Sequence, residues 1–182
     1  MKRMLSIALL LSLSISSYSQ EKRGFFAALG LGLNSTNTTM NIDEIPSGEN
    51  SDTGITSTVK LGGFLSPSTA LYYVREASWV NYNNVSTTAG LMGIGFTQYG
   101  AGDSPMYFEG AIGISDITFG WNELVPDASY GGFAMQVGIG LEVTPNLQIG
   151  ISYLYGSTPD WYWTNVDYET SVIAFKIELK NK

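Results

Sequence analysis

Beyond its first twenty residues, the chain consists largely of stretches in which big apolar residues alternate with small or polar ones. The clearest stretch covers residues 132–143 and places at every second position Phe133, Met135, Val137, Ile139, Leu141 and Val143. Successive side chains of a β-strand point to opposite sides, so this alternation predicts a strand with one apolar face and one small or polar face.

Turn residues divide the alternating stretches into consecutive predicted strands. These strands cover about residues 24–35, 53–65, 69–80, 88–99, 106–120, 132–143, 147–155 and 173–179. Short connections at 66–68, 100–105 and 144–146 alternate with long ones at 36–51, 81–86, 121–129 and 156–166. Outer-membrane barrels show this alternation, with short periplasmic turns and longer external loops.

The small faces carry charges, including Glu142, Lys176 and Glu178, whereas the opposite faces are apolar. A closed barrel in a membrane accommodates both faces, because hydrocarbon contacts the apolar side and the interior is polar. The predicted fold is therefore all-β, an eight-stranded antiparallel up-and-down transmembrane β-barrel. At this strand number the lumen is only wide enough for side chains to fill.

The facing of the predicted strand 69–80 is less regular than that of the others. We favour an outward direction for Ala70, Tyr72 and Val74, because this turns Arg75 into the lumen. Glu76 then faces outward near the far end of the strand. A β-bulge is the alternative that would reconcile these two charges.

The N-terminal segment has the features of a secretory signal peptide. Lys2 and Arg3 precede an apolar run over residues 4–13, and small residues suited to signal peptidase follow at Ser17 and Ser19. The run is shorter than the roughly 20 residues of a membrane-spanning helix. We expect a signal peptide over 1–20, cleaved after Ser19 or Gln20, and one barrel domain over 21–182.

Composition narrows the possible partners and chemistry. Removal of Lys2 and Arg3 leaves 7 basic against 16 acidic residues, a net charge of −9, so nucleic acid is not expected as a partner. The chain has no Cys and no His. This excludes disulfides, lipoprotein attachment and nucleophile–imidazole pairs, so we expect no enzyme activity, no cofactor and no metal.

The segments SYSQ, GGFLSPSTALYYV, YFEGAIGIS and GIGLEVTPNLQIGISYLYG carry a resemblance to a known family. In these segments the chain resembles the small outer-membrane β-barrel proteins of Gram-negative envelopes, of the porin-like, OmpA-barrel and OmpX kind. The resemblance implies an outer-membrane location and contact with lipid, lipopolysaccharide and the barrel assembly machinery. Such barrels often end on an aromatic residue, whereas Leu179 is followed here by Lys180, Asn181 and Lys182. The resemblance therefore implies an assembly signal that is either weaker or differently placed, with Phe175 as a candidate centre.

Charged residues predicted to face the lumen form the first candidate site. They are Lys60, Arg75, Glu109, Glu142, Lys176 and Glu178. One interpretation is a salt-bridge gate in a narrow pore, and the other, which we favour, is a static plug of paired charges. Both require pairing, because unpaired charges in a tight lumen are costly.

Aromatic and acidic residues of the predicted external loops form the second candidate site. Its members are Trp121, Asp160, Trp161 and Trp163. Exposed aromatic residues can anchor a partner, and acids can bind divalent cations that bridge lipopolysaccharide. The alternative, which we favour for the aromatic residues, is the girdle at the membrane interface.

Three functional hypotheses follow from these features. The first is a monomeric outer-membrane barrel with a structural or cell-surface interaction role and no catalysis. The second is a narrow ion or small-solute pore. The third is a secreted or periplasmic β-barrel that binds a small apolar ligand, which the charged lumen disfavours because ligand sites are mostly apolar.

Overall fold

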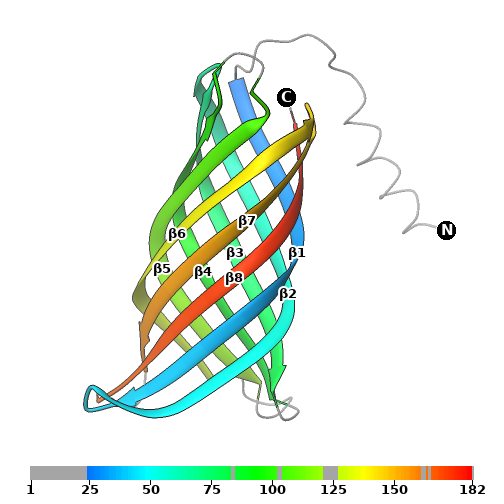
Figure 1. Ribbon diagram of the computed structural model, residues 1–182. Helices are drawn as coiled ribbons and strands as arrows, with labels where there is room; N and C mark the ends of the chain where they lie inside the picture. The colour runs from blue at the N-terminus through cyan, green and yellow to red at the C-terminus, as the bar shows by residue number, and fades with distance from the viewer. Residues whose placement is uncertain are drawn as a thin grey trace, which may run out of the picture.

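The computed structural model describes residues 24–82, 85–101, 104–120, 127–160, 163 and 165–181. They form eight strands, which are β1 (Gly24–Ile42), β2 (Ile45–Ser66), β3 (Thr69–Tyr82), β4 (Val85–Tyr99), β5 (Met106–Gly120), β6 (Asp127–Thr144), β7 (Leu147–Pro159) and β8 (Val166–Lys180). Each strand pairs antiparallel with its neighbours in sequence, and β8 pairs with β1 to close the barrel (Figure 1). The predicted fold class is confirmed.

The two ends of the barrel differ. The start of β1, the end of β8 and the turns at Pro67–Ser68 and Pro145–Asn146 lie at one end, here termed the turn end. The connections β1–β2, β3–β4, β5–β6 and β7–β8 lie at the opposite end, here termed the loop end. Among the described residues, no helix is long and apolar enough to cross a membrane. Residues 1–23, which hold the predicted signal peptide, lie outside the described residues.

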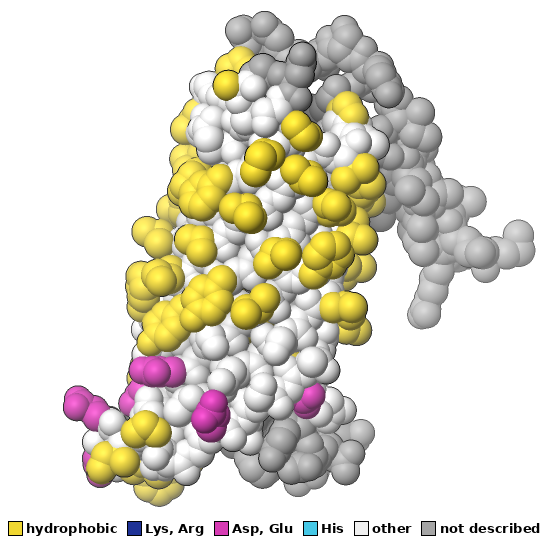
Figure 2. Space-filling model, viewed as in Figure 1, with side chains coloured by type: hydrophobic (Ala, Val, Ile, Leu, Met, Phe, Trp, Pro, Cys, Tyr) yellow, Lys and Arg dark blue, Asp and Glu magenta, His cyan; other side chains and the backbone are white. Residues whose placement is uncertain are grey.

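Alternation along each strand separates an apolar outer surface from a mostly polar or small-residue interior. On β1, Leu33 is 70% exposed whereas its neighbour Asn34 is 5% exposed. The same pattern on all strands leaves large apolar side chains around the outside, here termed the apolar belt (Figure 2). Water-facing surfaces rarely carry an apolar patch larger than a few hundred Å². The belt is therefore suited to hydrocarbon.

The β1–β2 connection differs from the prediction. The long loop expected over 36–51 is wrong, because β1 continues to Ile42, β2 begins at Ile45, and only Asp43 and Glu44 form the turn. The polar character of this region favours a loop. The region nevertheless forms strands, because β1 pairs with β2 on one side and with β8 on the other as far as Ile42. We term residues 36–52, which form the part of the β1–β2 pair beyond Ser35 and Thr53, the projecting hairpin.

The facing of β3 also differs from the prediction. Ala70, Tyr72 and Val74 are almost fully buried and point inward, so their predicted outward direction is wrong. Glu76 consequently points inward and Arg75 outward. Pairing with β4 runs without a register shift from Thr69 to Tyr82, so no bulge resolves the conflict. Two adjacent charges on a strand must face opposite sides, and Glu76 is the one whose partner, Lys176, lies in the lumen.

Candidate functional site in the barrel lumen

Five charged side chains meet in the middle of the lumen. They come from β2, β3, β5 and β8 and are Lys60, Glu76, Glu109, Lys176 and Glu178, here termed the lumen network. Each is at most 3% exposed. Each of these side chains points inward because it lies on the face of its strand opposite to the apolar belt.

Lys60 joins two of the three carboxylates. Its Nζ atom lies 2.5 Å from Oε2 of Glu109 and 2.8 Å from Oε2 of Glu178. β2 and β5 are not neighbours in the barrel, so the contact with Glu109 crosses the lumen. A buried ammonium group tolerates loss of water only when such partners replace it.

Lys176 makes the second set of contacts. Its Nζ atom lies 2.8 Å from Oε2 of Glu76, 3.1 Å from Oε1 of Glu109 and 3.8 Å from Oε1 of Glu178. Glu109 therefore bridges both lysines, one with each carboxylate oxygen. The network contains two ammonium groups and three carboxylates, which gives it one surplus negative charge.

Neutral donors add hydrogen bonds to the carboxylates, although Oε1 of Glu76 and Oε1 of Glu178 accept none from the described residues. The amide of Gln136 donates to Glu76 at 2.9 Å and to Glu109 at 3.3 Å. The amide of Gln148 donates to Glu178, and the hydroxyl of Thr58 donates to Glu76 at 3.1 Å. These donors offset part of the cost of the surplus charge, because hydrogen bonds to charged groups are stronger than neutral ones.

Glycines provide the space that the charged side chains occupy. A Cβ atom on Gly30 would lie 2.8 Å from Cγ of Glu178, and one on Gly138 would lie 2.8 Å from both Cγ and Oε1 of Glu109. The small inward residues of the alternating pattern are thus required by the size of the side chains opposite them. The lumen is therefore tightly packed at this level.

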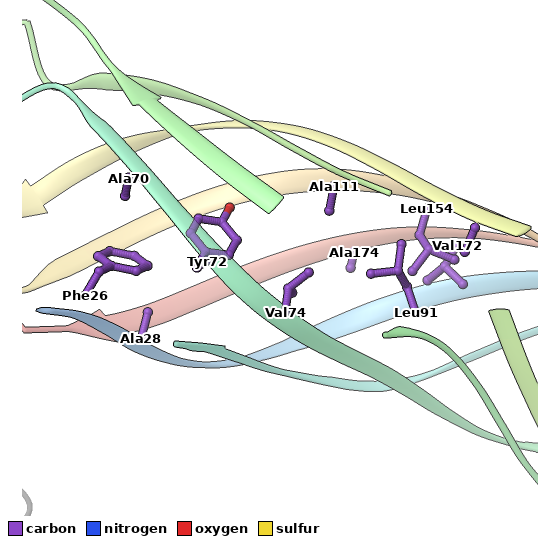
Figure 3. Close-up of a cluster of buried hydrophobic side chains, with 11 residues drawn as sticks. Phe26, Ala28, Ala70, Tyr72, Val74, Leu91, Ala111, Leu154, Val172 and Ala174 are labelled. Atoms are coloured by element: carbon purple, nitrogen blue, oxygen red, sulfur yellow. The ribbon is translucent and has the colours of Figure 1, made fainter. Parts of the chain in front are cut away.

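Buried apolar side chains also line the lumen (Figure 3), and they form a group toward each end of the barrel. Toward the turn end is an aromatic cluster of Phe26, Phe64, Tyr72, Tyr99 and Tyr107, whose adjacent rings have centroids 5.3–6.3 Å apart. Toward the loop end, Leu91, Leu154 and Val172 fill the interior and are at most 1% exposed. The network is therefore enclosed along the barrel axis as well as around it.

Four of the six residues predicted for the lumen site lie in the network, namely Lys60, Glu109, Lys176 and Glu178. Glu142 lies apart from them and forms an ion pair with Lys180. Nζ of Lys180 also lies 4.2 Å from the ring centroid of Tyr99, in a cation–π contact. Glu142 thus belongs to the turn end of the lumen.

Arg75 was predicted to face the lumen, and this prediction is wrong. Its guanidinium lies on the outer surface, where it forms two parallel hydrogen bonds with the carboxylate of Asp116 on β5. It passes over Gly90 on the intervening strand β4, where a Cβ atom would lie 2.7 Å from Nη1 of Arg75. The bidentate pair satisfies a charge that an outward position near the apolar belt would otherwise leave exposed to lipid.

The sequence interpretation missed Glu76 as a site residue and gave no role to Gln136 and Gln148. Correct facing of β3 would have identified Glu76, because it would have placed a third carboxylate beside two lysines. The two glutamines occupy inward positions of apolar-alternating strands. Because an amide can donate hydrogen bonds to carboxylates, an inward-facing glutamine in a charged lumen indicates that its side chain takes part in the network.

The second candidate site is described only in part. Trp121 and Trp161 lie outside the described residues. Trp163 is 67% exposed in the β7–β8 connection, and its backbone N–H donates to Oδ1 of Asp160 at 3.0 Å. Oδ2 of Asp160 accepts a hydrogen bond from the Tyr168 hydroxyl at 3.2 Å. Asp160 therefore orders the loop beside an exposed tryptophan.

Comparison with known proteins identifies the architecture. No protein-family model matches the chain, and no curated protein matches it at a significant level. Solved structures of similar fold include Neisserial surface protein A, with 12% identical residues, a TM-score of 0.56, and 86% of this chain and 98% of that one covered. The outer membrane protein OprG from Pseudomonas aeruginosa has 13% identical residues and a TM-score of 0.52, and the match covers 88% of this chain and 97% of that one. Ail, the attachment invasion locus protein of Yersinia pestis, has 11% identical residues and a TM-score of 0.52, and the match covers 85% of this chain and 98% of that one.

At these identities the likeness shows the fold alone. That fold is the small outer-membrane β-barrel, as the resemblance in the sequence implied. The predicted outer-membrane location agrees with the fold and with the apolar belt.

Proposed function

We propose that the protein is an integral outer-membrane barrel whose lumen is a static plug and whose role is structural or cell-surface interaction, without catalysis. The observation that supports this proposal most directly is the enclosed lumen network. Lys60 and Lys176 are each 1% exposed and are held by carboxylates from several strands. Ion passage would require these contacts to break at the same time as the packing of the aromatic cluster.

The two alternative functions receive less support. A pore needs a continuous water-accessible path, whereas the network is enclosed by apolar side chains toward both ends. A soluble ligand-binding barrel needs an apolar cavity and a polar exterior. Here charges fill the middle of the interior and the apolar residues face outward.

The loop end is the part of the molecule suited to interaction. Acidic side chains gather there, as Figure 2 shows, and they include Asp43, Glu44, Glu49, Asp52, Asp160, Asp167 and Glu169. Among the described residues no Lys or Arg is exposed. We propose that this end faces the cell exterior, that the barrel is a monomer, and that its lipid partners include lipopolysaccharide.

Conductance of the refolded protein in planar bilayers tests the closed lumen. We expect no channel events from the wild type or from Lys176→Ala, with folding monitored by gel migration with and without boiling. The matched control is Leu31→Ala on the outer surface, which leaves the lumen unchanged. Steady channel events in the wild type that change in size with Lys176→Ala but not with Leu31→Ala would establish the pore instead.

Single cysteines test the orientation, because the native chain has none. Ser51→Cys lies on the projecting hairpin, and Ala101→Cys lies at the turn end. A maleimide that cannot cross membranes should label the first variant in intact cells and the second only after lysis. The reverse order would contradict the proposed orientation, and release of the protein by osmotic shock would contradict membrane integration.

A further inference from the structure

One edge of β2 has no strand beside it at the loop end. β2 pairs with β1 from Ile45 onward, but its pairing with β3 begins only at Gly54, opposite Val80. Between Ile45 and Thr53, no strand of the described residues pairs with the second edge. The residues from Ile45 to Ser51 are all exposed, on both faces of β2.

An open strand edge presents N–H and C=O groups that can pair with another extended chain. Pro46 has no N–H and therefore limits pairing next to the turn. The usable edge runs from Ser47 to Thr53, here termed the free edge, and within it the Thr53 N–H donates to Oδ1 of Asp52 at 2.7 Å. It projects from the barrel at the loop end, away from the apolar belt (Figure 1).

The charges around the free edge determine what can approach it. Glu49 and Asp52 lie within it, and Asp43 and Glu44 form the adjacent turn. Asn37 on β1 donates to Oε1 of Glu49 at 2.9 Å, which holds this carboxylate on the hairpin. A second copy of the chain would bring acids against acids, whereas a basic strand would meet opposite charges.

The turn next to the free edge adds an apolar contact. Ile45 is 65% exposed and Ile42, its pairing partner across the turn, is 36% exposed. Asp43 and Glu44 have φ values of 52° and 64°, a left-handed backbone that is uncommon for residues other than glycine. Two such residues define a tight hairpin turn, which fixes both isoleucines at the tip.

We infer that the free edge accepts an extended, basic segment of another protein as an added β-strand, with an apolar side chain of that segment against Ile42 and Ile45. Backbone pairing supplies affinity, and Glu49 and Asp52 supply selection for lysine or arginine. The inference rests on the proposed function in one respect, which is that the loop end faces the exterior.

Binding of a defined probe to the refolded full mature chain in detergent tests the inference. The probe is a short fluorescent peptide in which lysine alternates with valine and threonine. One comparator has glutamate in place of lysine. Two further comparators keep every lysine. In one of them the backbone amides along one edge of the peptide strand are N-methylated, and in the other the amides along the opposite edge. Fluorescence anisotropy gives the affinities, and hydrogen exchange reports on the amides of Ser47–Thr53.

We expect the lysine peptide to bind and the glutamate peptide not to bind. Methylation of the pairing edge should weaken binding by about tenfold or more, because several hydrogen bonds are lost. The double variant Glu49→Gln/Asp52→Asn should weaken binding by about fivefold or more, whereas the matched change Glu169→Gln on β8 should have a smaller effect. Bound peptide should slow hydrogen exchange along the free edge.

Three results would overturn the inference. Equal binding of the parent and both methylated peptides would mean simple electrostatic attraction without strand pairing. Unchanged exchange of Ser47–Thr53 would place the peptide elsewhere, and self-association of the chain would assign the edge to a second copy. Failure of peptide binding leaves the conductance and cysteine-labelling results unaffected, so it is distinguishable from failure of the proposed function.

Discussion

Lys60 on β2 and Glu109 on β5 meet across the lumen, with Nζ 2.5 Å from Oε2, although their strands are separated by β3 and β4. The barrel wall is held by backbone pairing between neighbours. This contact instead ties opposite parts of the wall together through the interior. Because Glu109 also contacts Lys176, one carboxylate connects β2, β5 and β8. Loss of any one partner should therefore affect the whole barrel.

Replacement of Lys60 by methionine should destabilise the barrel strongly. The variant Lys60→Met retains most of the side-chain volume but leaves Glu109 and Glu178 with one cation fewer. Removal of one partner of a buried ion pair typically costs about 3–5 kcal/mol. Urea unfolding of the refolded protein in detergent, monitored by tryptophan fluorescence and gel migration, measures the change. A loss below about 1 kcal/mol, the size of an exposed pair, would show that the network contributes little.

Two of the network carboxylates, Glu109 and Glu76, should differ in their response to neutralisation. Glu109→Gln weakens contacts with both lysines and should cost about 2–4 kcal/mol in unfolding free energy. Glu76→Gln affects one lysine and removes the surplus negative charge, so we expect a loss of about 1 kcal/mol or less. The same unfolding assay compares the two variants. An equal loss for both would contradict the bridging role of Glu109.

The glycines of the lumen offer a test of packing that changes no charge. Gly138→Ala places a Cβ atom 2.8 Å from Glu109 and 3.1 Å from the carbonyl oxygen of Ile151. Overpacking of this kind typically costs about 1–3 kcal/mol. Gly48→Ala on the projecting hairpin is the matched control, because no atom lies within 4 Å of its new Cβ. Similar unfolding midpoints for both variants would contradict a filled lumen.

The strand alternation predicted the barrel because one physical constraint acts on most of its residues. Each outward position contacts hydrocarbon and each inward one a crowded interior, so a period of two in the sequence reports the fold directly. Lys60, Glu109, Lys176 and Glu178 were placed in the lumen on this basis alone. Their contacts could not be derived from the pattern, because cross-lumen pairing depends on strand tilt and register.

The errors arose where that constraint is weak. Arg75 and Glu76 are adjacent, and alternation cannot decide which of them faces outward. The choice depends on partners far away in sequence, since Asp116 pairs with Arg75 and Lys176 with Glu76. The projecting hairpin is mostly polar on both faces, so residues such as Thr38 and Asn50 show no alternation of apolar and polar side chains. Their strand structure follows from pairing with neighbouring strands.

The seam between β1 and β8 depends on the residue just after the last strand. β1 pairs with β8 only from Ala28, opposite Lys180, which leaves Phe25–Ala27 without a strand on that side. Asn181 replaces the missing strand. Its Oδ1 accepts the Ala27 N–H at 2.7 Å, its Nδ2 donates to the Phe25 carbonyl at 3.1 Å, and its own N–H donates to the Ala27 carbonyl at 3.0 Å.

Asn181→Ala should therefore weaken closure of the barrel at the turn end. Two side-chain hydrogen bonds disappear and the Ala27 N–H loses its acceptor, so we expect a loss of about 1–3 kcal/mol. The temperature at which the folded band converts to the unfolded band on gels should fall, and amide exchange should rise at Ala27. Asn50→Ala, on the exposed hairpin, is the control and should leave both readings unchanged. If Asn181→Ala matched the wild type in exchange at Ala27, backbone pairing alone would be sufficient to close the seam.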